Sequence, residues 1–360
     1  MIRRPKSIKQ GDTIGITAPS YGAYIEPYSL LYPIATQRIR ERGYRIVDGE
    51  TVHKGDGLGI STDPVTTAKE LMEFYSRDDI DAIISCGGGE LMCETISGVD
   101  FEALRDLPPK WFIGYSDNTN FIFPLVTISG VQGIYGPGIG GFAKVWEETE
   151  RYSFDILEGK RSSFDGLKRF VDPEKEAVDL SEGDKVYTDE WLRAPYGYNA
   201  DRELILFNYE NGVLNKAEDI KVSMEGILVG GCLDILVNLC GTRFDRVREF
   251  KKNYGRLIWV FEACDLTPMS IRRSLWNLRE AGWLDDAAGF IIGRPLQAWR
   301  QEMLGVDQYN AVTDILSPIG APVIMDAEVG HIDPMLPLIM GAGALVSADG
   351  NDLNITYINV

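Results

Sequence analysis

Short apolar runs alternate with segments of helical spacing through the first 145 residues of the chain. Residues 13–18 and 81–85 have the composition of buried strands, and so has the run at 111–113. Between the first two runs, residues 30–42 carry apolar side chains at helical spacing. Strands that alternate with helices along a chain pair in parallel, and the helices then cover both faces of the sheet. The pattern therefore predicts an α/β fold with a doubly wound, mostly parallel sheet.

A second series of predicted strands follows a stretch in which this pattern is lost. From about residue 144 to residue 200 the sequence is charged, aromatic and only weakly periodic, and its least regular part lies within 181–202. Long irregular segments in compact proteins are often lids or binding loops. Predicted strands resume later in the chain, at 255–261, 290–292 and 323–325.

The length of the chain, 360 residues, exceeds what one hydrophobic core usually supports and predicts two domains. We expect residues 1–165 to form an N-terminal domain that contains the doubly wound sheet. Residues 221–360 are expected to form a smaller C-terminal α/β domain. Residues 166–220 are expected to be an irregular linker that includes the aromatic loop.

Acidic residues outnumber basic residues by 54 to 36, which gives a formal net charge of −18. Such a chain repels phosphate backbones, and no basic run offsets this locally, so a nucleic acid polymer is excluded as a main partner. A single bound nucleotide is still compatible with this charge. The longest apolar stretch, 226–241, is interrupted by Asp234 and Asn238, and the first residues lack the apolar core of a signal peptide. We expect no membrane contact and a cytoplasmic location.

Two residue types that often carry chemistry are scarce. The five cysteines show no CxxC spacing, which predicts neither a disulfide framework nor a structural zinc site. The two histidines are His53, in a polar stretch, and His331, which follows a predicted strand end. Because functional residues of α/β folds collect at strand ends, His331 is the stronger candidate for a catalytic base.

Three glycines, at 87–89, follow the predicted strand at 81–85. A dinucleotide-binding fingerprint would need a further glycine where Met92 stands, so that motif is excluded. The glycines either form a tight turn or let backbone N–H groups approach a ligand closely.

The strand at 111–113 leads into the sequence GYSD at 114–117. A serine directly after a buried strand, two residues after a glycine, resembles a nucleophile elbow, in which a strained turn exposes the hydroxyl. Asn118 departs from the G-x-S-x-G pattern, and a serine at this place can also be an ordinary helix N-cap. Ser116 is thus a candidate nucleophile, but spacing cannot select its acidic partner from 54 carboxylates.

At these residues the sequence resembles a family of serine peptidases that includes LD-carboxypeptidases and the microcin C immunity protein. The segment FIGYSDNT at 112–119 is similar to the elbow of that family. Five further segments agree in the same order: GDTIGITAPS at 11–20, YGP at 135–137, GGCLDILVNLCGT at 230–242, VFEACD at 260–265 and GHIDPMLPLIMGA at 330–342. Together they extend from residue 11 to residue 342, which is nearly the whole chain.

The resemblance implies a catalytic triad of Ser116, Glu262 and His331. In such a triad the carboxylate orients the histidine and stabilises its imidazolium form, while the histidine takes the proton of the serine. No metal and no other cofactor is implied.

For the oxyanion, the resemblance implies the backbone N–H of Asp117 and one N–H of the glycine turn, from Gly88 or Gly89. After these glycines the chain has Glu-Leu-Met at 90–92. LD-carboxypeptidases usually have an Arg-Gly-Gly-Tyr-Gly type of turn, and the immunity branch commonly has Asn and Ser after the glycines. The turn therefore departs from both branches.

The segment between Ser116 and Glu262 is longer than in simple LD-carboxypeptidases, and we place the excess in the aromatic loop. In the immunity branch a loop in this region contributes an aromatic side chain that stacks on a nucleobase. Trp191 is the candidate for that role, and Tyr115 is the other candidate for substrate binding. The alternative for Trp191 is an exposed aromatic that packs on its own loop.

The function implied is amide hydrolysis through an acyl-enzyme, and two substrate classes are open. One is a murein tetrapeptide cut before its terminal D-alanine, as in peptidoglycan recycling. The other is a peptidyl- or aminoacyl-nucleotide of the microcin C type, which the longer aromatic insert favours. The resemblance also suggests a homodimer. A non-catalytic protein that binds a peptide or nucleotide on the same fold is the alternative, and the presence of all three triad residues argues against it.

Overall fold

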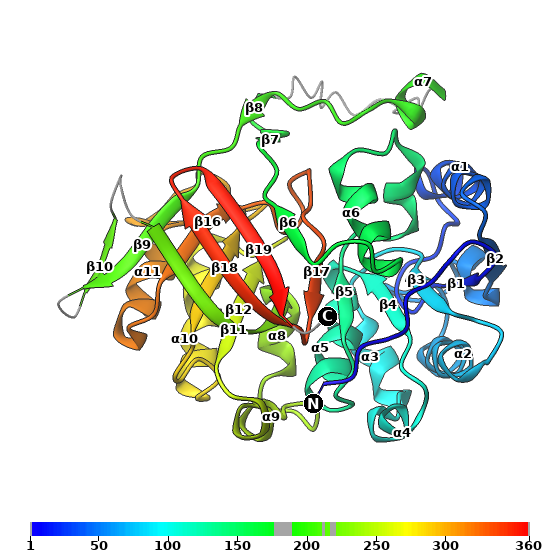
Figure 1. Ribbon diagram of the computed structural model, residues 1–360, viewed down its shortest axis with the longest axis horizontal. Helices are drawn as coiled ribbons and strands as arrows, with labels where there is room; N and C mark the ends of the chain where they lie inside the picture. Colours follow the sequence, from blue (N-terminus) through cyan, green and yellow to red (C-terminus); the bar gives the residue numbers. More distant parts are fainter. Residues whose placement is uncertain (1, 176–188, 211–212, 217–220, 359–360) are drawn as a thin grey trace.

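The computed structural model describes residues 2–175, 189–210, 213–216 and 221–358. Two large β-sheets lie side by side in it, the first built mainly from the N-terminal part of the chain and the second from the C-terminal part (Figure 1). Helices connect most of the parallel strands of both sheets. The expectation of an α/β fold is confirmed.

The first sheet has six strands in the order β17-β5-β4-β3-β1-β2. Five of them are parallel: β1 (Thr13–Thr17), β2 (Arg45–Asp48), β3 (Ala82–Ser85), β4 (Trp111–Gly114) and β5 (Gly133–Tyr135). The main helices between them are α1 (Tyr28–Glu41), α2 (Pro64–Ser76), α4 (Phe101–Asp106) and α5 (Thr119–Thr127). Within these five, the order 2-1-3-4-5 is that of a doubly wound sheet, in which ligands bind at the carboxyl ends of the strands.

The second sheet has nine strands, in the order β10-β9-β16-β13-β12-β11-β18-β19-β6. Its centre is parallel and consists of β11 (Lys221–Cys232), β12 (Leu257–Glu262), β13 (Gly289–Gly293) and β16 (Val323–Ala327). Antiparallel strands extend it on both sides: β9 (Ile205–Glu210), β10 (Val213–Lys216), β18 (Gly343–Asp349), β19 (Asp352–Ile358) and β6 (Ser163–Asp165). Its helices are α8 (Leu233–Leu239), α9 (Val247–Tyr254), α10 (Pro268–Glu280) and α11 (Asn310–Leu316).

Each part of the chain gives one strand to the other sheet. β6 belongs to the N-terminal part and pairs with β19, whereas β17 (Leu338–Met340) belongs to the C-terminal part and pairs antiparallel with β5. β17 covers the edge of the first sheet that β5 would otherwise leave unpaired. The division into domains at 1–165 and 221–360 stays a proposal about folding units, and the exchanged strands tie these units together.

Part of the stretch predicted to be irregular is regular. α6 (Glu148–Leu157) begins with a capping box formed by Glu147 and Glu150. Within 166–220, β9 pairs with β16 and extends the second sheet. The hairpin of β9 and β10 takes its stability from this pairing, so its sequence needs no strong periodic pattern of its own.

The remaining short elements are η1 (Glu50–His53), α3 (Met92–Thr95), η2 (Ile96–Gly98), η3 (Ser116–Asn118), η4 (Ile139–Ala143), β7 (Arg169–Phe170), α7 (Asp189–Arg193), β8 (Ala200–Asp201), β14 (Glu302–Met303), β15 (Val306–Asp307) and η5 (Ser317–Ile319).

Buried aromatic rings join the two sheets. Phe123 of α5 stacks on Trp283 with ring centroids 5.1 Å apart, and it lies 6.2 Å from Trp259 of β12. All three side chains are buried. Because α5 begins just after Ser116 and β12 ends at Glu262, this packing fixes the position of one strand end relative to the other.

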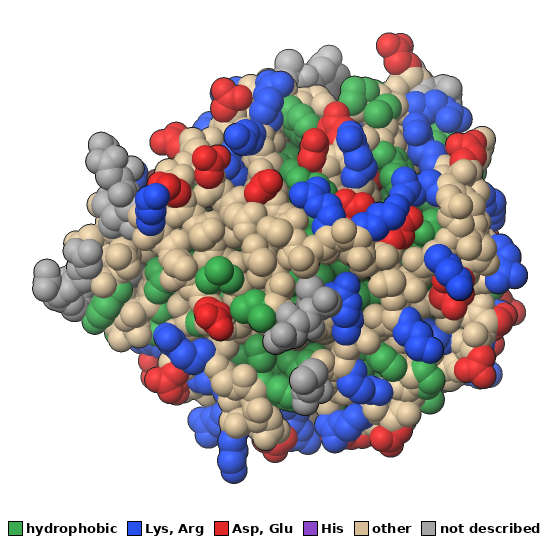
Figure 2. All heavy atoms as spheres, in the orientation of Figure 1, with side chains coloured by type: hydrophobic (Ala, Val, Ile, Leu, Met, Phe, Trp, Pro, Cys, Tyr) green, Lys and Arg blue, Asp and Glu red, His purple; other side chains and the backbone are tan. Residues whose placement is uncertain are grey.

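Charged side chains of both signs share the face drawn in Figure 2, where Lys and Arg are interspersed with Asp and Glu. Among the residues described on that face, the basic groups form no continuous stripe of the kind that binds a nucleic acid backbone. No helix within the described ranges is long and apolar enough to cross a bilayer.

Candidate active site

The candidate nucleophile lies on a strained turn after β4. Ser116 opens η3 and has a φ of 60°, a left-handed conformation that residues other than glycine seldom adopt. Asn118, which departs from the elbow pattern, donates through Nδ2 to the carbonyl of Gly87 at 2.8 Å. A Cβ at Gly114 would lie 2.8 Å from Asn118 Cγ, so the glycine makes room for this side chain. The turn has the form of a nucleophile elbow, and Asn118 ties it to the glycine turn.

His331 lies between Ser116 and Glu262 and contacts both. Its Nε2 is 2.9 Å from Ser116 Oγ, and its Nδ1 is 2.8 Å from Glu262 Oε2. Glu262 ends β12 and His331 follows β16, so these two come from the second sheet and the serine from the first. Gly330 has a φ of 110°, and a Cβ there would lie 2.6 Å from Glu262 Oε2. Glycine at this position lets the histidine loop approach the carboxylate.

The electrostatics of the pair favour charge on both partners. Burial raises the pKa of Glu262. The charge and hydrogen bond of His331 and the hydroxyl of Tyr135 lower it by more than burial raises it, so the net pKa is below the usual value. Burial lowers the pKa of His331, but the charge of Glu262 and contacts with Glu262 and Cys264 raise it well above the usual value. The site is therefore able to hold a proton on His331 opposite an ionised carboxylate, which is what a general base beside a serine requires.

The side chain of Asp117 is buried and anchors the elbow. Its Oδ2 accepts hydrogen bonds from Ser20 Oγ at 2.6 Å and from the backbone N of Met92 at 2.9 Å. Its Oδ1 accepts from Asn120 Nδ2 at 2.8 Å. Asp117 is the second residue of η3, so its backbone N–H has no partner within that helix. This N–H, next to the nucleophile, stays our candidate for binding an oxyanion.

Gly88 and Gly89 occupy different places beside the elbow. A Cβ at Gly88 would lie 3.1 Å from Ser116 Cβ and 3.3 Å from its Oγ. A Cβ at Gly89 would lie 2.1 Å from Ser20 Oγ, so any side chain there would clash with the loop after β1. The structure thus brings both glycines to the site, with Gly88 facing the nucleophile.

The other predicted residues have different outcomes. Tyr115 packs on the histidine, with its ring centroid 5.1 Å from that of His331. Trp191 belongs to α7, but its side chain lies outside the described part of the structure. His53 is exposed in η1 and does not line the pocket that contains Ser116 and His331. The structure therefore brings Tyr115 to the site and leaves His53 away from it.

Ser116 and His331 line an open pocket of about 360 Å³. The pocket walls also include the three glycines of the turn, the aromatic residues Tyr21, Tyr28, Tyr115 and Tyr196, and the charged residues Glu90, Lys144 and Asp333. Tyr196 comes from the aromatic segment, by which we mean residues 189–202, and its hydroxyl donates to Glu150 Oε1 at 3.0 Å. The pocket thus offers aromatic faces and charges of both signs to a small molecule.

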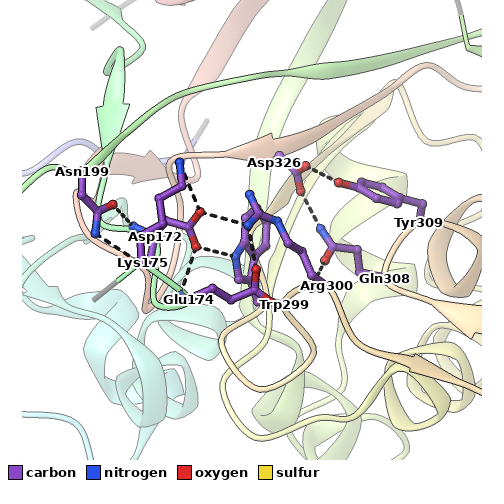
Figure 3. Close-up of polar contacts among 9 residues, drawn as sticks. All are labelled: Asp172, Glu174, Lys175, Asn199, Trp299, Arg300, Gln308, Tyr309 and Asp326. Carbon is purple, nitrogen blue, oxygen red and sulfur yellow. Dashed lines mark hydrogen bonds and ion pairs between the residues drawn. The ribbon is translucent and has the colours of Figure 1, made fainter. Parts of the chain in front are cut away.

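A polar network fastens the aromatic segment to the second sheet (Figure 3). The buried carboxylate of Asp172 accepts hydrogen bonds from Trp299 Nε1 at 3.1 Å and from Arg300 Nη1 at 3.0 Å. The backbone N of Asp172 donates to Oδ1 of Asn199, a residue of the aromatic segment, at 2.7 Å. No sequence pattern marks this network, because nothing distinguishes Asp172 from the other acidic residues.

Tyr135 is a contact of the triad to which the sequence alone assigns no role. Its YGP segment supports the family resemblance, but only the sheet order reveals that the end of β5 lies beside the elbow after β4. Its hydroxyl lies within hydrogen-bonding distance of both Ser116 N and Glu262 Oε1.

The five cysteines are free thiols. Among the described residues, no group of three or more His, Cys, Asp or Glu side chains is arranged to hold a metal ion.

Comparisons with known proteins find the same family over both parts of the chain. Residues 14–136 match the family model of the LD-carboxypeptidase N-terminal domain, and residues 225–346 match that of the C-terminal domain. A relative in Bacillus subtilis, named probable murein peptide carboxypeptidase, is 24% identical over 347 residues, which are 96% of this chain and 91% of the relative. The microcin C7 self-immunity protein MccF of Escherichia coli is 24% identical over 356 residues, 96% of this chain and 93% of MccF.

A solved structure of MccF with aspartyl sulfamoyl adenosine has a similar fold. It superposes with a TM-score of 0.74 at 21% identity, and the match covers 98% of each chain. The two sheets and their connection are thus a shared architecture.

Proposed function

Because the chain belongs to the LD-carboxypeptidase family, we propose that it hydrolyses an amide bond through an acyl-enzyme intermediate on Ser116. One observation carries the proposal: the imidazole of His331 bridges Ser116 Oγ and Glu262 Oε2 at 2.9 and 2.8 Å. Ser116 also stands on a strained turn that exposes its hydroxyl to the pocket. A serine in this setting is activated for attack on a carbonyl.

The chemistry follows from the three side chains. Ser116 Oγ attacks the scissile carbonyl carbon while His331 Nε2 takes its proton, and Glu262 stabilises the imidazolium. The negative charge that develops on the carbonyl oxygen is received by the backbone N–H groups of Asp117 and of Gly88 or Gly89. His331 then protonates the leaving amine, the C–N bond breaks, and a water molecule releases the acyl group by the same route.

For the substrate we propose a peptidyl- or aminoacyl-nucleotide, with a murein tetrapeptide as the second candidate. The first is supported by the aromatic segment, which contributes Tyr196 to the wall of the pocket that Tyr115 also lines. It is also supported by MccF, a relative whose structure was solved with aspartyl sulfamoyl adenosine. The second is supported by the relative named murein peptide carboxypeptidase.

Product analysis separates these candidates. The wild type and Ser116→Ala are incubated with a murein tetrapeptide and with a microcin C-type nucleotide, and the products are identified by mass spectrometry. A free nucleotide-linked product from the wild type alone supports the immunity-type activity, and free D-alanine supports the murein activity. Equal cleavage by Ser116→Ala, or no cleavage of any amide, contradicts the proposed hydrolysis.

We also propose a homodimer in the cytoplasm, as the family resemblance suggests. Light scattering coupled to size-exclusion chromatography tests the dimer, for which the expected mass is twice the 40.1 kDa of the chain. A single species of monomer mass would contradict it.

A further inference from the structure

The hydroxyl of Tyr135 makes two hydrogen bonds to the catalytic machinery. It lies 3.1 Å from the backbone N of Ser116 and 2.5 Å from Oε1 of Glu262. The direction of both bonds is fixed, because a peptide N–H can only donate and an ionised carboxylate can only accept. The hydroxyl oxygen therefore accepts from Ser116, and its proton is donated to Glu262.

These two bonds close a ring around the active site. From the backbone of Ser116 the ring passes through Tyr135 to Glu262, from there to His331, and back to Ser116 through its Oγ. We propose that Tyr135 is a positioning residue for the hydrolysis, which holds the nucleophile's backbone and the triad carboxylate in one fixed relation. This inference rests on the proposed function and adds a residue that touches neither the substrate nor the reacting atoms.

The bond to Ser116 acts on the elbow. A non-glycine residue with a φ of 60° keeps that conformation only when its surroundings hold it there. Tyr135 holds the N–H of Ser116 from the neighbouring strand, since β5 pairs with β4 through Tyr135 and Gly114. Without the hydroxyl, the backbone N–H of Ser116 loses its hydrogen-bond partner. The strained backbone that orients Ser116 Oγ toward the substrate is then held less firmly.

The hydrogen bond from Tyr135 to Glu262 affects His331, the general base, through the carboxylate that the two side chains share. The Glu262 side chain has no exposed surface, so a carboxylate oxygen without a donor would be costly. Tyr135 satisfies Oε1 and leaves Oε2 to His331 Nδ1. The hydrogen bond from Tyr135 also stabilises part of the negative charge of the Glu262 carboxylate. Without it, the carboxylate stabilises the protonated imidazole of His331 more strongly, which raises the pKa of His331.

The surroundings fix the Tyr135 ring independently of its hydroxyl. The side chain is fully buried, and a Cβ at Gly231, whose φ is 140°, would lie 3.2 Å from Tyr135 Cε2. Burial and the charge of Glu262 raise the pKa of Tyr135 well above its usual value, so the hydroxyl keeps the proton that it donates. Tyr135→Phe therefore keeps the packing and removes only the two hydrogen bonds.

Tyr75 offers a matched control at the opposite end of β4. It is a buried tyrosine of α2 whose hydroxyl accepts from the backbone N of Lys110 at 3.3 Å, just before β4, whereas Ser116 follows the other end of β4. We expect Tyr135→Phe to lower kcat about 10- to 100-fold with little change in KM, because one buried carboxylate oxygen and one N–H lose their partners. We expect Tyr75→Phe to keep the wild-type kcat. Equal losses in the two variants, or a change confined to KM, would overturn the inference.

A titration of His331 tests the inference without any substrate. The chain has two histidines, so in a His53→Asn background every imidazole NMR signal belongs to His331. The titratable groups that face His331 are Glu262, Cys264, Glu90 and Tyr115, and none of them is altered by the variants. We expect Tyr135→Phe to raise the pKa of His331 above that of the same background with Tyr135 intact, and Tyr75→Phe to leave it unchanged. An unchanged pKa in Tyr135→Phe would overturn the positioning role, whereas failure of the wild type to cleave any amide would overturn the proposed function instead.

Discussion

The triad and the aromatic segment border the same pocket but are held in different ways. Ser116, Glu262 and His331 lie at the ends of strands or just after them, and bonds of 2.9 Å or less join the three. The aromatic segment instead crosses between the two parts of the molecule, and polar contacts of Tyr196 and Asn199 fasten it (Figure 1, Figure 3). On one side Tyr196 binds Glu150 of α6, and on the other the Asp172 network binds it to the second sheet.

This difference indicates a division of work. A strand end is fixed by the whole sheet behind it, so the reacting groups keep their geometry whatever the substrate is. A segment fastened at separate points can change its sequence and its ligand contacts without moving the strand ends. We infer that the triad sets the reaction and that the aromatic segment sets the substrate, and each prediction below alters one of the two regions.

The largest effect is expected from the triad. Ser116→Ala and His331→Ala should each lower kcat by about 10⁴- to 10⁶-fold, because the nucleophile or its base is lost. His53→Ala is the matched control, and since His53 is exposed and away from the pocket it should retain wild-type kcat. Steady-state kinetics on the cleaved substrate measure all three. A comparable loss in His53→Ala would contradict the assignment of the base.

A smaller effect is expected from the anchor beneath the elbow. Asp117→Ala removes the acceptor of Ser20 Oγ, Met92 N and Asn120 Nδ2, and we expect kcat to fall about 10- to 100-fold while KM changes little. Asp245→Ala is the control, because Asp245 does not line the pocket but also accepts several hydrogen bonds, among them one from Trp283 Nε1 at 3.0 Å. Thermal melting of both variants shows the structural cost. If Asp245→Ala loses as much kcat as Asp117→Ala, the anchor has no specific role.

The pH dependence should follow the His331–Glu262 pair. His331 must be neutral to accept a proton. Burial lowers its pKa, but the charge of Glu262 and the contacts with Cys264 and Glu262 together outweigh burial and raise the pKa well above 6.5. We therefore expect kcat/KM to rise with pH through a value above 6.5 and to fall about tenfold per pH unit below that value. The raised pKa stabilises the fold fully below the unfolded value of about 6.5, and this stabilisation is lost as pH rises through the folded pKa. Activity gained and stability lost over the same pH range are the expected result, and an acid limb below 6.5 would contradict it.

The smallest effect is expected from the attachment of the aromatic segment. Asp172→Ala removes the acceptor of Trp299 and Arg300, so we expect KM to rise about 3- to 10-fold while kcat and its pH profile stay near those of the wild type. Asp314→Ala, which breaks a surface ion pair with Arg272 at 2.8 Å, is the control and should change neither constant. A loss of kcat in Asp172→Ala equal to that in Asp117→Ala would show that the two regions are not independent.

The sequence predicted the strands around the candidate site well and the contacts between the two parts of the chain less completely. Strong apolar runs predicted β1, β3, β4 and β12. Because the chain has two histidines, a catalytic histidine had to be His331 or His53. The choice of Glu262 needed the family resemblance, because spacing cannot distinguish one acidic residue from 54.

The contacts that the sequence could not predict depend on the order of the strands. Tyr135 reaches Ser116 and Glu262 only because β5 lies beside β4 and the second sheet packs against both. β6 and β17 each join the sheet formed mainly by the other part of the chain, and no local pattern specifies such an exchange. The Asp172 network likewise joins residues that are more than 100 positions apart in sequence.

The central claim is that Ser116 is an activated nucleophile, and covalent labelling tests it most directly. The wild type, Ser116→Ala, His331→Ala and His53→Ala are treated with a fluorophosphonate that reacts with activated serines, and intact mass and peptide mapping locate the adduct. We predict one adduct on Ser116 in the wild type and in His53→Ala, and none in Ser116→Ala or His331→Ala over the same time. An unlabelled wild type, or an adduct that forms at the same rate in His331→Ala, would contradict the account.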